Sequence, residues 1–159
     1  MRESNGVVRY SVTETAAEIR KALKRAYPGI RFSVRSDKHS GGASIRVHWT
    51  DGPTAQEVDR IAQVFSGADF DGMQDLKTYH DSEWQGRQVS WGADFVFAER
   101  SFSRAFLSAI AAEVCAAEGV PVPAVRGTDD DAYIPLMPTR LGTLNAQELV
   151  YRAARERAA

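Results

Sequence analysis

Hydrophobic and polar residues alternate along residues 30–54, and this alternation predicts a β-hairpin. The residues expected to point inward are Ile30, Phe32, Val34, Ile45, Val47 and Trp49. The turn between the two strands comprises His39, Ser40, Gly41 and Gly42. Glycine adopts the backbone conformations that a tight reversal needs. The hairpin therefore has one apolar face that must be covered and one polar face.

The polar face of the hairpin is our candidate binding surface. It carries Arg31, Arg35, Arg46 and His48. Within each strand these residues lie an even number of positions apart, so they share one side of the pleat. A sheet covered by helices on one face leaves its other face to solvent. The alternative interpretation is that these side chains only confer solubility and pair with acids such as Asp94 on a neighbouring strand.

Helical spacing of apolar residues predicts two helices that flank the hairpin in the sequence. The first covers residues 13–27, with Thr15 and Glu18 as a possible capping box. Four basic residues in its last two turns suit the negative end of the helix dipole, and they could also contact a phosphate backbone. The second begins at Thr54, where Glu57 completes a capping box, and ends near residue 66.

The second half of the chain predicts further strands and helices. Residues 76–80 form a possible strand, and residues 88–97 alternate as a strong one. Its inward side chains should be Val89, Trp91, Ala93, Phe95 and Phe97. A long helix should follow from Ser101 or Ser103 and end at Gly119. After an irregular segment, Asn145 should cap a final helix.

These elements indicate an α+β fold, with an antiparallel sheet of about four strands and helices packed on one face. We divide the chain into an N-terminal arm (1–12), the α+β domain (13–118) and a C-terminal extension with a terminal helix (119–159). One shared core is expected from the apolar faces of these elements. Its members should be Phe32, Val34, Ile45, Val47, Val58, Ile61, Phe65, Phe95 and Leu107.

Composition agrees with a soluble globular protein. Of the 159 residues, 43% are hydrophobic and 26% are charged, and no apolar run reaches the roughly 18 residues that a membrane span needs. Without a signal-peptide core at the N-terminus, we expect a cytoplasmic location and no membrane partner. The net charge is −1, but residues 1–50 hold ten Lys and Arg against four Asp and Glu. Residues 51–99 hold three against ten, which indicates either an interaction face or complementary halves of one fold.

Candidate chemistry is sparse. The chain has no nucleotide-binding glycine motif, and its single cysteine, Cys115, cannot form an internal disulfide. The three histidines (His39, His48 and His80) are scattered in sequence, and the acids near residue 70 do not match the spacing of a calcium loop. We therefore predict no catalytic residue, no metal and no cofactor. An enzymatic function ranks lowest among the functions that we consider.

Several motifs resemble a known family. They are the strand FSVR at 32–35, the turn SGG at 40–42, the segment WTDGPT at 49–54 and the segment FDGM at 70–73. Together with the preceding helix they cover roughly residues 13–100 and resemble the large polyvalent-protein-associated domain number twenty-nine. The resemblance implies a setting in long multidomain proteins of phages and conjugative elements. It also implies a role during DNA entry or against host defences, and it supplies no catalytic residues.

Two functional hypotheses follow. The first is a non-enzymatic binding module of a phage or mobile element that contacts a host or phage protein. The second is a nucleic-acid-binding module that uses the basic face of the sheet. The near-neutral net charge argues against strong non-specific affinity for nucleic acid.

Overall fold

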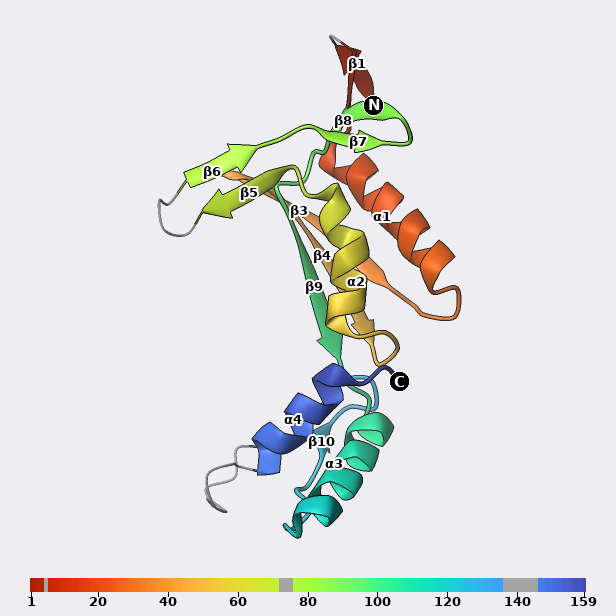
Figure 1. The fold of residues 1–159 in the computed structure, drawn as a ribbon, viewed down its shortest axis with the longest axis vertical. Helices are drawn as coiled ribbons and strands as arrows, with labels where there is room; N and C mark the ends of the chain where they lie inside the picture. The colour runs from red at the N-terminus through yellow and green to blue at the C-terminus, as the bar shows by residue number, and fades with distance from the viewer. Residues whose placement is uncertain (5, 72–75, 136–145) are drawn as a thin grey trace. The chain divides into compact units, whose positions relative to one another are not determined.

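The computed structural model describes residues 1–4, 6–71, 76–135 and 146–159. It forms two compact units (Figure 1). The first unit contains Met1–His48 and Gln56–Glu99, and the second contains Trp49–Ala55 and Arg100–Ala159. The fold is mixed α+β, and its largest sheet has four strands, which confirms the predicted fold class.

The described residues form three β-sheets and, in the second unit, a short two-stranded ribbon. The four-stranded sheet has the order β1-β2-β8-β7, and its β2–β8 pair is parallel. Its strands are β1 (Arg2–Ser4), β2 (Val7–Arg9), β8 (Arg87–Ser90) and β7 (Ser82–Trp84). Strands β5 (Ala68–Asp71) and β6 (Leu76–Tyr79) form an antiparallel pair. Residues 72–75 of the acidic turn lie outside the described residues.

The predicted hairpin is confirmed as β3 (Ser33–His39) and β4 (Gly42–Thr50), which pair antiparallel. Gly42 has a φ of 143°, a conformation that favours glycine, so the turn depends on this residue. Strand β9 (Phe95–Ser101) is the neighbour of β4 in a three-stranded sheet. The Asp94 amide donates to the Ala43 carbonyl at 2.7 Å, and the Asp51 amide donates to the Ser101 carbonyl at 2.9 Å. Because both strands advance together between these two bonds, β9 runs parallel to β4.

Helices α1 (Val12–Ala26) and α2 (Ala55–Ala62) lie in front of the β3-β4-β9 sheet in Figure 1. Helix α1 packs against β3. The side chains of Val34, Ile45 and Val47 are buried on the sheet, and Val58 of α2 is also buried. These apolar residues therefore occupy the covered side, as the alternation predicts.

Helix α1 begins at Val12, one residue before the predicted start, and its N-cap lies four residues before the predicted cap at Thr15. Ser11 is its N-cap, and Glu14 completes a capping box with it, so the expected capping box at Thr15 is wrong. Thr15 is instead buried, with its hydroxyl donating to the Ser11 carbonyl at 2.9 Å and accepting from the Gly92 amide at 3.1 Å. A methyl group at Gly92 would collide with the backbone of Tyr10 and Ser11, so only glycine fits this approach.

The predicted strand over residues 88–97 is two strands, and the inward face changes phase between them. Val89, Trp91 and Ala93 are buried, but after the break Val96 is buried and Phe97 is 48% exposed. At the break, the Asp94 carboxylate accepts a hydrogen bond from the Ala43 amide at 2.8 Å. Phe97 therefore points away from the core, and the expectation that it points inward is wrong. The half-buried Phe95 shares its face.

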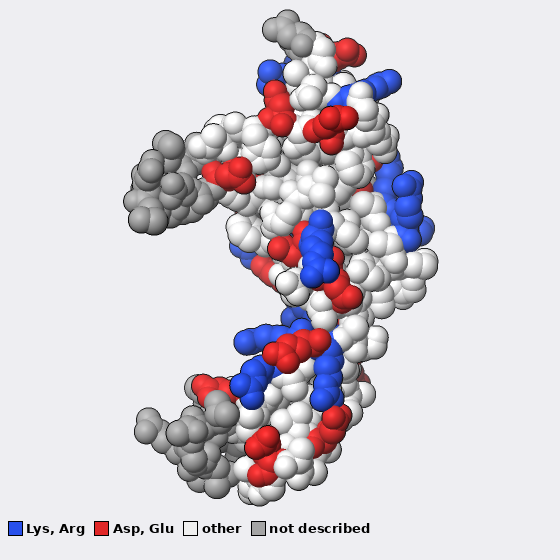
Figure 2. All heavy atoms as spheres, in the orientation of Figure 1, with Lys and Arg blue, Asp and Glu red and all other residues white. Residues whose placement is uncertain are grey.

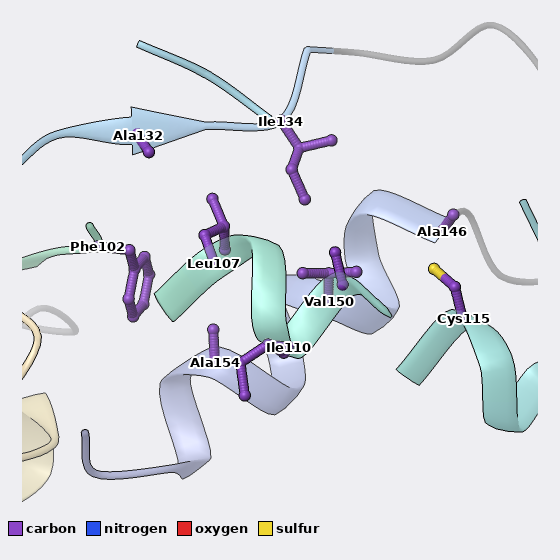
Figure 3. Close-up of a cluster of buried hydrophobic side chains, with 10 residues drawn as sticks. Phe102, Leu107, Ile110, Cys115, Ala132, Ile134, Ala146, Val150 and Ala154 are labelled. Carbon is purple, nitrogen blue, oxygen red and sulfur yellow. The ribbon is translucent and has the colours of Figure 1, made fainter. Parts of the chain in front are cut away.

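The second unit has its own core, shown in Figure 3. Its elements are α3 (Arg104–Glu118), β10 (Arg126–Gly127), β11 (Ala132–Tyr133) and α4 (Ala146–Glu156). Ser103 caps α3, and Gly119 ends it with a φ of 67°, as predicted. Leu107 packs here with Ile110 and Val150, so a single core that includes Leu107 is wrong. Asn145, the expected cap of α4, lies outside the described residues.

Of the helices within the described segments, none combines the length and the apolar character that crossing a membrane requires.

Candidate binding surface on the β3-β4-β9 sheet

A hollow of about 290 Å³ lies on the polar side of the β3-β4-β9 sheet, within the first unit. Its lining residues come from all three strands: Ser33, Arg35, Arg46, His48 and Glu99. The strand register explains this grouping, since Ser33 is directly opposite His48 and Arg35 is directly opposite Arg46. Directly opposed residues share one face of an antiparallel pair. Three of the four predicted surface residues therefore meet at one place.

Arg31, the fourth predicted residue, is exposed but precedes the first residue of β3. It does not line the hollow. The alternation assigned Arg31 to a strand that in fact begins two residues later, at Ser33. Because Arg31 lies outside the strand, the alternation of side chains along a strand does not place Arg31 with the other three residues.

Glu99 is the acid of this surface, and sequence reasoning missed it. Its carboxylate lies 3.9 Å from the Arg46 guanidinium, between Oε1 and Nη1. The two side chains are 49% and 64% exposed, so the ion pair is weak and is screened by salt. Asp94, the acid proposed from the sequence, is buried, and its carboxylate accepts a hydrogen bond from the Ala43 amide. The change of phase after Asp94 is what brings Glu99 to this face.

The same change of phase brings an aromatic ring to this side of the sheet. Phe97 lies two residues before Glu99 on β9, so both side chains project from one face. Its ring centre is 6.4 Å from that of Phe95, which agrees with that placement. We use the term open face for the set comprising Ser33, Arg35, Arg46, His48, Phe97 and Glu99. This face combines cationic, polar and aromatic side chains on one rigid sheet.

A second basic surface follows helix α1. Lys and Arg side chains gather beside this helix on the face shown in Figure 2. Lys21 pairs with Glu18 at 2.7 Å, and Arg20 donates to the Val34 carbonyl, so both have partners within the unit. Lys24 and Arg25 are exposed in the last turn, where positive charge complements the helix dipole. Contacts within the unit and the helix dipole explain the basic residues of this surface without a ligand. Substitutions on this surface therefore serve as a matched control for substitutions on the open face.

The second unit contains another hollow, of about 400 Å³, lined in part by Phe102, Tyr133 and Tyr151. Arg100 also lines it, but this guanidinium is committed to the fold. It donates to the carbonyls of Asp51 and Ala154 at 3.0 Å, and it lies 5.0 Å from the centre of the Phe102 ring. Arg100 therefore stabilises the turn at Asp51 and the end of α4, and these carbonyls occupy its donors.

Catalytic chemistry receives no support from the geometry. Within the ranges that the structure describes, no cluster of three His, Cys, Asp or Glu side chains is arranged to hold a metal ion. Cys115 is buried, and desolvation raises the pKa of its thiol, which lowers its reactivity. His39 and Ser40 are exposed at the hairpin turn. The tryptophans Trp49 and Trp91 are buried core residues and do not present a stacking surface.

The first unit is thus an α+β module with a covered apolar side and an open face of mixed cationic and aromatic character. The family model of large polyvalent protein associated domain 29 matches residues 10–103, and the chain belongs to this family. The match ends immediately before α3 begins at Arg104. Neither the comparison with curated proteins nor that with solved structures found a match.

Proposed function

We propose that this chain is a non-enzymatic binding module of a phage or other mobile genetic element, and that it binds its partner through the open face. The observation that supports this proposal is the grouping of Arg35, Arg46 and Phe97 on one exposed side of a sheet. Exposed aromatic and arginine side chains are enriched where proteins bind macromolecules. The chain belongs to the family of large polyvalent protein associated domain 29. We propose, from the setting that this resemblance implies, that the module counteracts host defence or assists DNA entry in the cytoplasm.

The sheet gives this surface the rigidity that recognition benefits from. Arg35 and Arg46 are held opposite each other by the ladder between β3 and β4, and on the covered side Val34 and Val47 are buried. A binding surface on paired strands loses little backbone entropy when a partner binds. The opposed arginines repel each other, which destabilises the free protein slightly. Glu99 offsets part of this repulsion at Arg46, and a partner that supplies negative charge offsets more of it.

Capture from a bacterial lysate tests the proposal. The wild-type chain and the variant Arg35→Glu/Arg46→Glu are immobilised in parallel, and captured protein and nucleic acid are both quantified. The control variant Lys24→Glu/Arg25→Glu changes the net charge equally on α1. We expect the open-face variant to lose captured material that the α1 variant retains, while both keep the wild-type circular dichroism spectrum, since exposed charges add little stability. Equal retention by both variants would remove the open face from the proposal.

A further inference from the structure

Among the residues of the open face, Phe97 has the exposed position that protein stability explains least. Its side chain is 48% exposed although it lies in the centre of β9, where the buried Val96 precedes it. Single exposed hydrophobic residues are ordinary on protein surfaces. Phe97 differs from an isolated case because it shares its face with Glu99 and with the arginines of the neighbouring hollow. A ring on the same side of the sheet as two arginines offers both a stacking surface and positive charge to one partner.

The charge on the open face favours an anionic partner. Arg35 and Arg46 are directly opposite each other, and Glu99 provides the negative charge beside them at 3.9 Å from Arg46. Among the residues that line the hollow, the two arginines exceed the single carboxylate of Glu99. Asp37, two residues beyond Arg35 on β3, adds an exposed carboxylate to the same side of the sheet outside the hollow. Guanidinium groups bind phosphate through paired hydrogen bonds. The pair of guanidinium groups in the hollow therefore fits phosphate groups.

The ring decides between single-stranded and double-stranded nucleic acid. Bases in a duplex are stacked on each other and present only their edges, so a ring on a flat sheet cannot stack on them. A single strand can turn a base outward onto an aromatic side chain while its phosphates follow basic residues. An acidic peptide would satisfy the arginines, but it would use Phe97 only if it also carried an aromatic or apolar side chain. The combination of ring and arginines fits the single strand best.

We propose that the open face binds single-stranded nucleic acid, with a base stacked on Phe97 and phosphates bound by Arg35 and Arg46. This inference rests on the proposed function and names its partner. Because the whole chain has a net charge of −1, binding depends on this local surface and is sensitive to salt.

Fluorescence anisotropy with a labelled oligonucleotide tests the inference directly. The same mixed sequence is presented to the full chain as a single strand and as a duplex, each at low and at physiological salt. We expect the single strand to bind more tightly than the duplex. Phe97→Ala should weaken single-strand binding roughly 5- to 150-fold, the measured range for the loss of one base–aromatic stack. The control Val64→Ala, at another exposed hydrophobic residue, should leave binding unchanged.

Salt dependence separates the roles of the ring and the arginines. Arg35→Gln/Arg46→Gln should reduce the slope of log affinity against log salt by about 1.4, since each phosphate contact to a single strand contributes about 0.7. Phe97→Ala should leave that slope unchanged. Equal affinity for duplex and single strand, insensitivity to Phe97→Ala, or no binding at low salt would each overturn the inference. If one of these results is found and the arginine variant nevertheless loses a protein that the wild-type chain captures from lysate, the proposed function stands while this inference fails.

Discussion

Replacing Phe65 with alanine tests the packing of the first unit. The Phe65 side chain is 1% exposed, and its ring centre lies 4.9 Å from those of both Trp84 and Trp91. Truncation of a buried phenylalanine removes apolar contacts and leaves a cavity, which together destabilise a protein by about 3–5 kcal/mol. Two lost aromatic pairs, each contributing about 0.5–1.5 kcal/mol, place Phe65 in the upper part of that range.

Urea unfolding followed by tryptophan fluorescence measures this loss. For a slope of about 1–3 kcal/mol per molar urea, the midpoint of Phe65→Ala should fall by at least about 1 M with an unchanged slope. Phe97→Ala removes the same atoms from an exposed site and should change stability by less than about 1 kcal/mol. A loss below 1 kcal/mol for Phe65→Ala, or equal losses for the two variants, would refute the assigned packing.

Three further predictions concern backbone fit, the second unit and pH. Gly92→Ala should destabilise strongly because its methyl collides with backbone at the start of α1, whereas Gly29→Ala, in open space, should be nearly neutral by thermal unfolding. Arg100→Met should destabilise the second unit by about 2–3 kcal/mol, because several backbone carbonyls lose a charged donor. Arg100→Lys should not restore the lost stability, and limited proteolysis can report both effects. The Arg157 hydrogen bond at 2.7 Å lowers the pKa of Glu113, so this contact stabilises above the unfolded pKa of glutamate and is lost as pH falls through the lower folded value. The stability difference between wild type and Glu113→Gln should therefore vanish in acid, and a difference that is constant with pH would contradict this account.

The hairpin could be predicted from sequence because local alternation and buried residues agree there. Val34, Ile45 and Val47 alternate with polar residues, and the ladder keeps one phase along both strands. The grouping of Arg35 with Arg46 followed from the same rule. These features depend on neighbours in sequence and on one turn, which is the information that a single chain presents most clearly.

Residues 88–97 could not be predicted in the same way, because the break between the two strands coincides with a contact to a residue far away in the sequence. The alternation continues through Trp91 to Phe97 without any local signal of a change. The Asp94 carboxylate bonds to the Ala43 amide, 51 residues away in sequence, and the face reverses after it. The sequence therefore did not predict that Phe97 and Glu99 lie on the open face. The N-cap of α1 is different, since Ser11 and Glu14 also have the spacing of a capping box, whereas the prediction placed the box at Thr15 and Glu18.

Backbone amide NMR during titration with a single-stranded oligonucleotide tests the central claim most directly, because it locates binding without any substitution. The account predicts saturable shifts concentrated at Arg35, Arg46 and Phe97, with little change along the basic turn of α1 or around the hollow at Tyr133. Shifts centred on Lys24 and Arg25, or on the second unit, with the three strands unaffected, would contradict the assignment of the open face as the binding surface.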